Sequence, residues 1–165
     1  MKKLIPLLLL LVFTSLGAQK IADGETVTVD GLAVTFNILN KESVTAGGKT
    51  YDRYKVSATL VNNSGKDFSL RLSNAPQVVT KTELVELDCI NATGAKLTSK
   101  KLTLKMNPQN LNVTYWAYTK DGKYQSFVIP VVSGYFLDNG GSVSDNAIFI
   151  VPQGEAPNVT VRKTL

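Results

Sequence analysis

The segment TVTVDGLAVTFNI, residues 26–38, decides the fold class of this chain. Apolar and polar residues alternate on both sides of Asp30-Gly31, as they do in strands that bury one face. An Asp-Gly pair tolerates positive φ at both positions and favours a two-residue hairpin turn. The segment therefore predicts an antiparallel hairpin over Thr26–Ile38, with Val34 and Phe36 on its buried face.

The same alternation recurs along the chain between turn residues. It predicts further strands over 54–60, 68–72, 85–89, 102–106, 111–119, 124–132, 147–151 and 159–161, and loops over 40–52 and 133–145. A short helix over 82–90 is the alternative to the strand at 85–89. Nine or ten short strands with regularly spaced turns are typical of an antiparallel β-sandwich or barrel.

A second hairpin is expected over Val113–Ile129, around Asp121-Gly122. A two-residue turn there places Trp116 opposite Phe127, on a face that we expect to be core. Tyr115 and Tyr124 then lie on the other face, where they are the candidate ligand-binding residues because tyrosine rings stack on sugars. The full set of expected core residues is Val34, Phe36, Val56, Leu60, Trp116, Phe127, Ile129, Phe149 and Val161.

Two local features complete the strand predictions. Lysines alternate with apolar residues between Lys101 and Lys105, which is typical of an edge strand that resists pairing with other chains. Cys89 lies in phase with Val85 and Leu87, so we expect a buried and inert thiol.

The composition excludes most catalytic chemistry that depends on histidine or paired cysteines. The chain has no histidine and one cysteine. It therefore has no Ser-His-Asp triad, no Cys-His pair, no histidine zinc site and no intramolecular disulfide. We expect a protein that is not an enzyme and holds no cofactor.

Residues 1–18 predict a secretory signal peptide. Lys2 and Lys3 precede an apolar run from Leu4 to Phe13, and small residues follow up to Ala18. Residues 19–165 then form a single domain, exported to the periplasm or the extracellular space, with a net charge of about +3. We expect neither nucleic-acid binding nor a membrane span in this mature part.

Two groups of carboxylates are weighed as sites. Asp138 and Asp145 are weak candidate calcium ligands, because calcium prefers carboxylate oxygens, although this composition is also that of an ordinary hairpin loop. Glu83 and Glu86, together with Asp138 or Asp145, would be the residues of a carboxylate-based hydrolase if they lined one cleft. Alternating acids beside Val85 favour a solvated face instead, so no catalytic or metal residue is assigned.

Two segments resemble a known group of domains. LVNNSGKDFSLRL, residues 60–72, resembles a strand–turn–strand of exported bacterial immunoglobulin-like domains, and IFIVPQGEAPNVTVRK, residues 148–163, resembles their closing strands. The group comprises small secreted domains of unknown function and the FxLYD-like domains. The resemblance implies a two-sheet antiparallel immunoglobulin-like β-sandwich and a non-catalytic role, and it carries over no functional residue.

The expected function is a secreted or periplasmic binding module whose partner is an unknown protein or glycan at the cell surface. Three alternatives stay open: a carbohydrate-binding sandwich that uses Tyr115 and Tyr124, a structural subunit that polymerises through an edge strand, and a carboxylate hydrolase. An unpaired, uncharged edge would favour the polymerising subunit.

Overall fold

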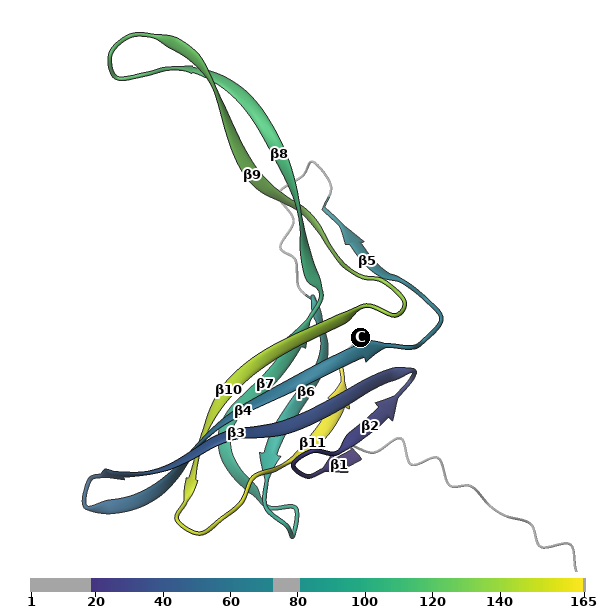
Figure 1. Ribbon diagram of the computed structural model, residues 1–165, viewed down its shortest axis with the longest axis vertical. Coiled ribbons are helices and arrows are strands. Elements are labelled where there is room, and N and C mark those ends of the chain that lie inside the picture. The colour runs from purple at the N-terminus through teal and green to yellow at the C-terminus, as the bar shows by residue number, and fades with distance from the viewer. Residues whose placement is uncertain (1–18, 73–80, 165) are drawn as a thin grey trace, which may run out of the picture.

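The computed structural model describes residues 19–72 and 81–164, which form an all-β antiparallel protein with three sheets and no helix in these ranges (Figure 1). The predicted signal peptide, residues 1–18, lies outside the described residues. The strands are β1 (Gln19–Ile21), β2 (Thr26–Val29), β3 (Leu32–Ala46), β4 (Lys49–Asn62), β5 (Phe68–Arg71), β6 (Glu83–Ile90), β7 (Lys96–Lys105), β8 (Asn107–Tyr118), β9 (Tyr124–Leu137), β10 (Ser142–Pro152) and β11 (Asn158–Lys163).

Two four-stranded sheets enclose the hydrophobic core. The first sheet has the order β1-β11-β6-β7 and the second β10-β4-β3-β2, and buried side chains of both belong to one cluster. The third sheet, β5-β9-β8, extends away from these two (Figure 1). The expected core residues that are buried are Val34, Phe36, Val56, Leu60, Phe149 and Val161.

The predicted hairpin over Thr26–Ile38 is confirmed. Val29 pairs with Leu32, and the two turn residues Asp30 and Gly31 have φ of 49° and 80°. Gly31 is required here for a second reason: a Cβ at this position would lie 2.5 Å from the Cα of Ser64, closer than two non-bonded carbon atoms can approach.

The predicted loop over 40–52 is wrong, because β3 and β4 continue as a ribbon to a tight turn. Ala46 pairs with Lys49 across Gly47-Gly48, and both glycines have positive φ. Side chains on this ribbon are mostly exposed or half-buried. Polar composition therefore does not distinguish such a strand from a loop.

The predicted loop over 133–145 is also wrong. β9 pairs with β5 over Gly134–Leu137, and β10 begins at Ser142. Only the turn between Leu137 and Ser142 remains without strand structure.

The segment around Cys89 is strand β6 and not a helix. β6 pairs with β11 on one side and with β7 on the other, so β7 is the edge of the first sheet, as its lysines predict. Lys101 contacts Glu86 at 2.9 Å, and Lys96 contacts Asp88 at 3.2 Å, so these acids lie on a charged outer face.

Cys89 should react with thiol reagents only after unfolding. The thiol is fully buried, and burial raises its pKa to about 12, so almost no thiolate forms near neutral pH. We expect labelling by a chromogenic disulfide reagent to be at least about a hundredfold slower in native protein than in guanidinium chloride. Equal rates in the two conditions would show that the thiol is accessible in the native state.

Across 19–72 and 81–164, the structure has no helix long and apolar enough to cross a membrane.

Candidate functional site

The β8–β9 hairpin projects beyond the two core sheets as an arm (Figure 1). We define the arm as residues 107–137, which comprise β8, β9 and the turn between them. Only its root is widened by a third strand, because β5 pairs with β9 over Gly134–Leu137. The outer part is a two-stranded ribbon, and such a ribbon is at best marginally stable in water unless something covers it.

The turn at the tip of the arm differs from the predicted two-residue turn. The N–H of Thr119 donates to the carbonyl of Lys123 at 2.8 Å, and Gly122 has a φ of 74°, so the loop has three residues. Asp121 does not have positive φ, which fits a turn closed by a glycine bulge. Tyr118 therefore pairs with Tyr124, and every predicted pair is displaced by one residue.

This register changes the aromatic contacts. Trp116 pairs with Ser126 and stacks on Tyr124, with ring centroids 5.6 Å apart, and Tyr118 contacts the same ring at 4.9 Å. On the opposite face Tyr115 stacks on Phe127 at 5.5 Å. The prediction that Tyr115 and Tyr124 share a face is therefore wrong, and they do not form one platform.

The arm also corrects the predicted core. Trp116 is 60% exposed and Ile129 is 43% exposed, while Phe127 is half-buried. Apolar residues do alternate in this segment, but no second layer of described residues packs on either face of the hairpin. Trp116, Phe127 and Ile129 are surface residues of the arm.

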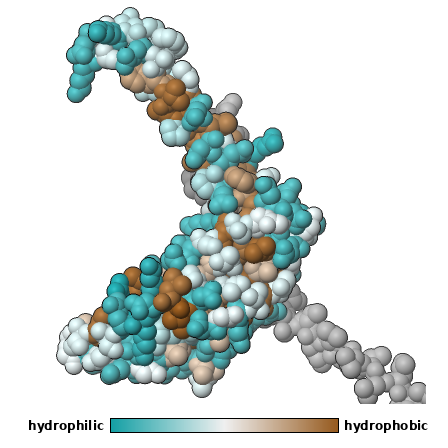
Figure 2. Space-filling model, in the orientation of Figure 1, coloured by the Kyte–Doolittle hydropathy of each residue, from teal (hydrophilic) through white to brown (hydrophobic). Residues whose placement is uncertain are grey.

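The strands of the arm carry no charge. Neither the 12 residues of β8 nor the 14 of β9 include Asp, Glu, Lys or Arg, in a chain of which 19% is charged. Hydrophobic atoms extend along the arm and hydrophilic atoms gather at its end in Figure 2. The exposed apolar side chains are Leu111, Val113, Tyr115, Trp116, Tyr118, Tyr124, Val128, Ile129, Val131 and Val132. Alternation in the sequence does not show that these side chains are exposed; the signal that could have shown it is the absence of charge over 107–119 and 124–137.

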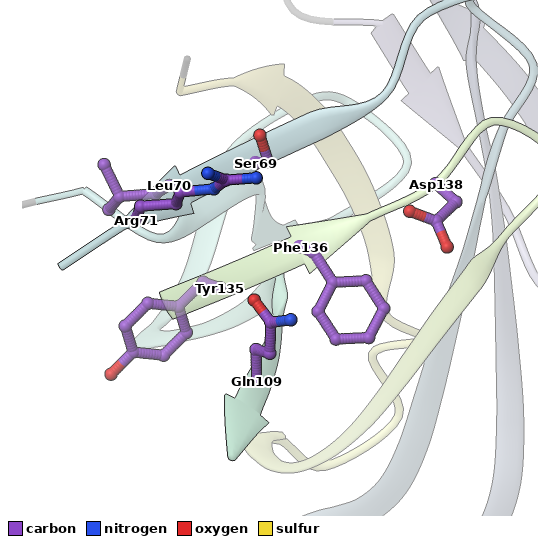
Figure 3. A pocket seen from close by; sticks show the side chains of 7 residues that line it. All are labelled: Ser69, Leu70, Arg71, Gln109, Tyr135, Phe136 and Asp138. Atoms are coloured by element: carbon purple, nitrogen blue, oxygen red, sulfur yellow. The ribbon is translucent and has the colours of Figure 1, made fainter. Parts of the chain in front are cut away.

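An open hollow of about 300 Å³ lies at the root of the arm (Figure 3). Side chains of β5, β8 and β9 line it, among them Arg71, Gln109 and Tyr135. Asp138 stands apart from these groups at one end of the hollow in Figure 3. The hollow gathers one cation, one carboxylate and no paired acids, so it offers no acid–base pair.

The predicted acidic residues are distributed over different elements. Glu83 and Glu86 lie in β6, Asp138 follows β9, and Asp145 lies within β10, opposite Ala58. Among the described residues, no three His, Cys, Asp or Glu side chains are close enough to hold a metal ion together, and Asp138 and Asp145 belong to no such group.

Hydrogen bonds and ion pairs favour the charged form of Glu83 and Glu86. Hydrogen bonds from Lys101 and Arg162 keep the pKa of Glu86 below its usual value. The pKa of Glu83 is lowered by backbone hydrogen bonds and by Lys105. A general acid for glycoside hydrolysis needs a raised pKa, so the lowered pKa values of Glu83 and Glu86 do not favour that chemistry.

Asp52 has the most buried carboxylate of the described chain, and three neighbouring groups contact its oxygen atoms. Lys41 contacts it at 2.9 Å, the hydroxyl of Ser43 donates at 3.1 Å, and the N–H of Gly154 donates at 2.9 Å. Lys41 contributes most to lowering the pKa of Asp52, with Gly154 next. These bonds connect the β10–β11 turn to β3 and β4, which is a structural role.

Asp52 should make stability depend on acid pH. Because its pKa is lower in the folded protein, its contribution is complete above the unfolded value of about 4 and is lost as pH falls through the folded value. Asp52→Asn should therefore be less stable than wild type at pH 7, with a difference that shrinks toward pH 2. Urea denaturation across this range measures it, with exposed Asp145→Asn as control. A difference between Asp52→Asn and wild type that is independent of pH would contradict the assignment.

Comparison with protein-family models, curated proteins and solved structures found no match to this chain.

Proposed function

We propose that this chain is an exported, non-catalytic binding module that contacts a protein or glycan at the cell surface through the β8–β9 arm. The observation that carries the proposal is the arm itself: a ribbon of two uncharged strands, with exposed apolar side chains on both faces, that projects from a folded body. Contiguous exposed apolar surface on a soluble protein marks an interaction site. A partner that covered the arm would also stabilise a ribbon that is marginal on its own.

The body of the protein fits the role of a scaffold. Two four-stranded sheets around one core are the arrangement expected of an immunoglobulin-like sandwich, and we propose that architecture for the body. The rigid core would hold the root of the arm in place, because Asn62 at the end of β4 donates to the carbonyls of Leu137 and Asp138.

Binding to washed cells of the native host, measured with labelled mature protein by flow cytometry, tests the proposal. Trp116→Ala/Tyr124→Ala removes the stacked pair of the arm and should weaken binding at least about tenfold, as loss of aromatic hot spots does. The matched control is Ile148→Ala/Ile150→Ala, which removes two exposed apolar side chains from β10. Binding that survives in the arm variant but is lost in the β10 variant would overturn the proposal.

A carbohydrate ligand is the second candidate, and the exposed stack of Trp116 on Tyr124 favours it. Aromatic faces of this kind can stack on sugar rings, and Trp116 takes the place that the sequence assigned to Tyr115. A glycan array with the same two variants distinguishes this candidate from a protein partner.

Export is part of the proposal and has its own test. The signal-peptide pattern predicts removal of residues up to Gly17 or Ala18. Intact mass of the protein recovered from its native host should begin at residue 18 or 19, and retention of Met1 to Ala18 would contradict export by this route.

A further inference from the structure

The hydrogen-bond pattern of the arm shows which backbone groups of β8 point away from β9. Thr119 and Lys123 are hydrogen-bonded to each other, and such pairs alternate with non-bonded pairs along an antiparallel ladder. Pro130 has no N–H and pairs with Asn112, which agrees with a non-bonded pair at that position. The β8 residues whose N–H and C=O groups point outward are therefore Asn110, Asn112, Thr114, Trp116 and Tyr118.

This outer edge of β8 lacks the lysines that β7, an edge strand of the first sheet, carries. No strand in the described ranges pairs with it, because β8 ends the order β5-β9-β8. Edge β7 carries Lys96, Lys100, Lys101 and Lys105, whereas β8 has no charged residue. Proteins normally place lysine or proline on an exposed edge to prevent pairing with another chain. On the outer edge of β9, Pro130 has no backbone N–H, so one hydrogen-bond donor is missing there. On β8, each outward-facing residue from Asn110 to Tyr118 has its backbone N–H.

We infer that two copies of this chain associate through β8, edge to edge and antiparallel, to form a four-stranded sheet β9-β8-β8-β9. This inference rests on the proposed function only in taking the arm as the contact element. In this dimer the β8 edge of one copy pairs with the β8 edge of the other across a two-fold axis. Both copies therefore contribute the same surface, as a closed dimer requires. Four strands also remove the marginal stability of the isolated ribbon.

In one register of the two β8 strands, all five outward-facing residues of each copy can hydrogen-bond to the other copy. The side-chain pairs that this register creates are also favourable. Thr114 lies opposite Thr114 of the second copy, and Val113 lies opposite Tyr115. Threonine pairs and pairs of a β-branched with an aromatic residue both stabilise antiparallel sheets.

Charge favours this orientation as well. Lys120 and Lys123 are the only cations of the arm, and both lie at its tip. An antiparallel dimer places the two tips at opposite ends of the sheet, whereas a parallel dimer would bring four lysines together. Like charges in direct opposition destabilise a sheet.

Analytical ultracentrifugation of the mature protein, residues 19–165, tests the association. We expect a concentration-dependent dimer for the wild type and at least a tenfold weaker dimer for Thr114→Lys, which places two lysines opposite each other. Ser126→Lys is the matched control. Ser126 lies opposite Trp116, on the same face of the arm as Thr114 but on β9, so that variant should still form the dimer.

Cross-linking tests the register without relying on a destabilising change. Thr114→Cys should form an intermolecular disulfide under mild oxidation, whereas Ser126→Cys should not, and buried Cys89 does not interfere. A wild type that stays monomeric at about 100 μM, where a dimer of micromolar Kd would be almost fully formed, would overturn the inference. So would a dimer that survives Thr114→Lys and gives no cross-link at residue 114. A monomer that still binds cells through Trp116 and Tyr124 would refute the dimer alone, and a dimer whose arm variants bind cells normally would refute the proposed function alone.

Discussion

Phe36→Ala should lower the free energy of unfolding by about 3–5 kcal/mol, the usual effect of truncating a buried phenylalanine. Phe36 is fully buried in β3, opposite Ala58 of β4, in the cluster between the first two sheets. Its removal leaves a cavity that the small neighbouring Ala58 cannot fill. The loss is a large part of the roughly 5–15 kcal/mol that stabilises a typical domain. Urea denaturation of a protein comprising residues 19–165 measures it.

Trp116→Ala is the matched control, with the opposite expectation. Its side chain is mostly exposed and contacts Tyr124 by stacking, so truncation should cost about 1 kcal/mol or less. The alternation in the sequence predicts the reverse, namely a core tryptophan. If the two variants lose equal stability, the arm is packed against the body in solution and the arrangement described above is wrong.

Asn62→Ala should lower stability by about 2–4 kcal/mol, because several hydrogen bonds of a buried side chain lose their partner together. Asn62 is fully buried, and its amide donates to the carbonyls of Lys66, at 2.7 Å, and Leu137, at 3.2 Å. Its side-chain oxygen accepts from the N–H and the hydroxyl of Ser64 at 3.1 and 2.6 Å. These bonds connect the turn after β4 to the end of β9, and hence to the root of the arm. Thermal and urea denaturation report the loss.

Asn63→Ala is the control for this position. Asn63 is exposed, and its backbone N–H, which the substitution keeps, donates to the carbonyl of Gly31 at 2.8 Å. We expect its stability to remain within about 0.5 kcal/mol of wild type. An Asn62→Ala protein as stable as Asn63→Ala would mean that water satisfies the exposed groups and that this network does not hold the arm.

The two Asp-Gly pairs show how far turn chemistry specifies a hairpin. At Asp30-Gly31 both residues have positive φ, and the predicted register is correct. At Asp121-Gly122 only the glycine does, and the register differs by one residue. The first hairpin packs one face on the core, so the hydrophobic pattern excludes a one-residue slip. The part of the arm beyond its root has no buried face in the described structure, so burial does not select the register there.

The candidate surface was predicted in part. The sequence predicts an aromatic hairpin over 113–129, and Tyr124 belongs to its exposed stack. The partner of Tyr124 is Trp116 and not Tyr115, because the true turn is one residue longer. The uncharged edge of β8 is visible in the sequence only once the structure shows that β8 ends its sheet.

Local chemistry, and therefore the amino-acid sequence alone, determines the strand class, the first hairpin, the buried thiol of Cys89 and the lysine-bearing edge β7. Each of these follows from alternation or turn residues within about ten positions. Tertiary structure decides which apolar faces are covered. Alternation shows that a strand has an apolar face, but burial also needs a second layer, contributed by segments distant in the chain. Phe36 meets such a layer in the first sheet, and Trp116, with the same local pattern, meets none in the described structure.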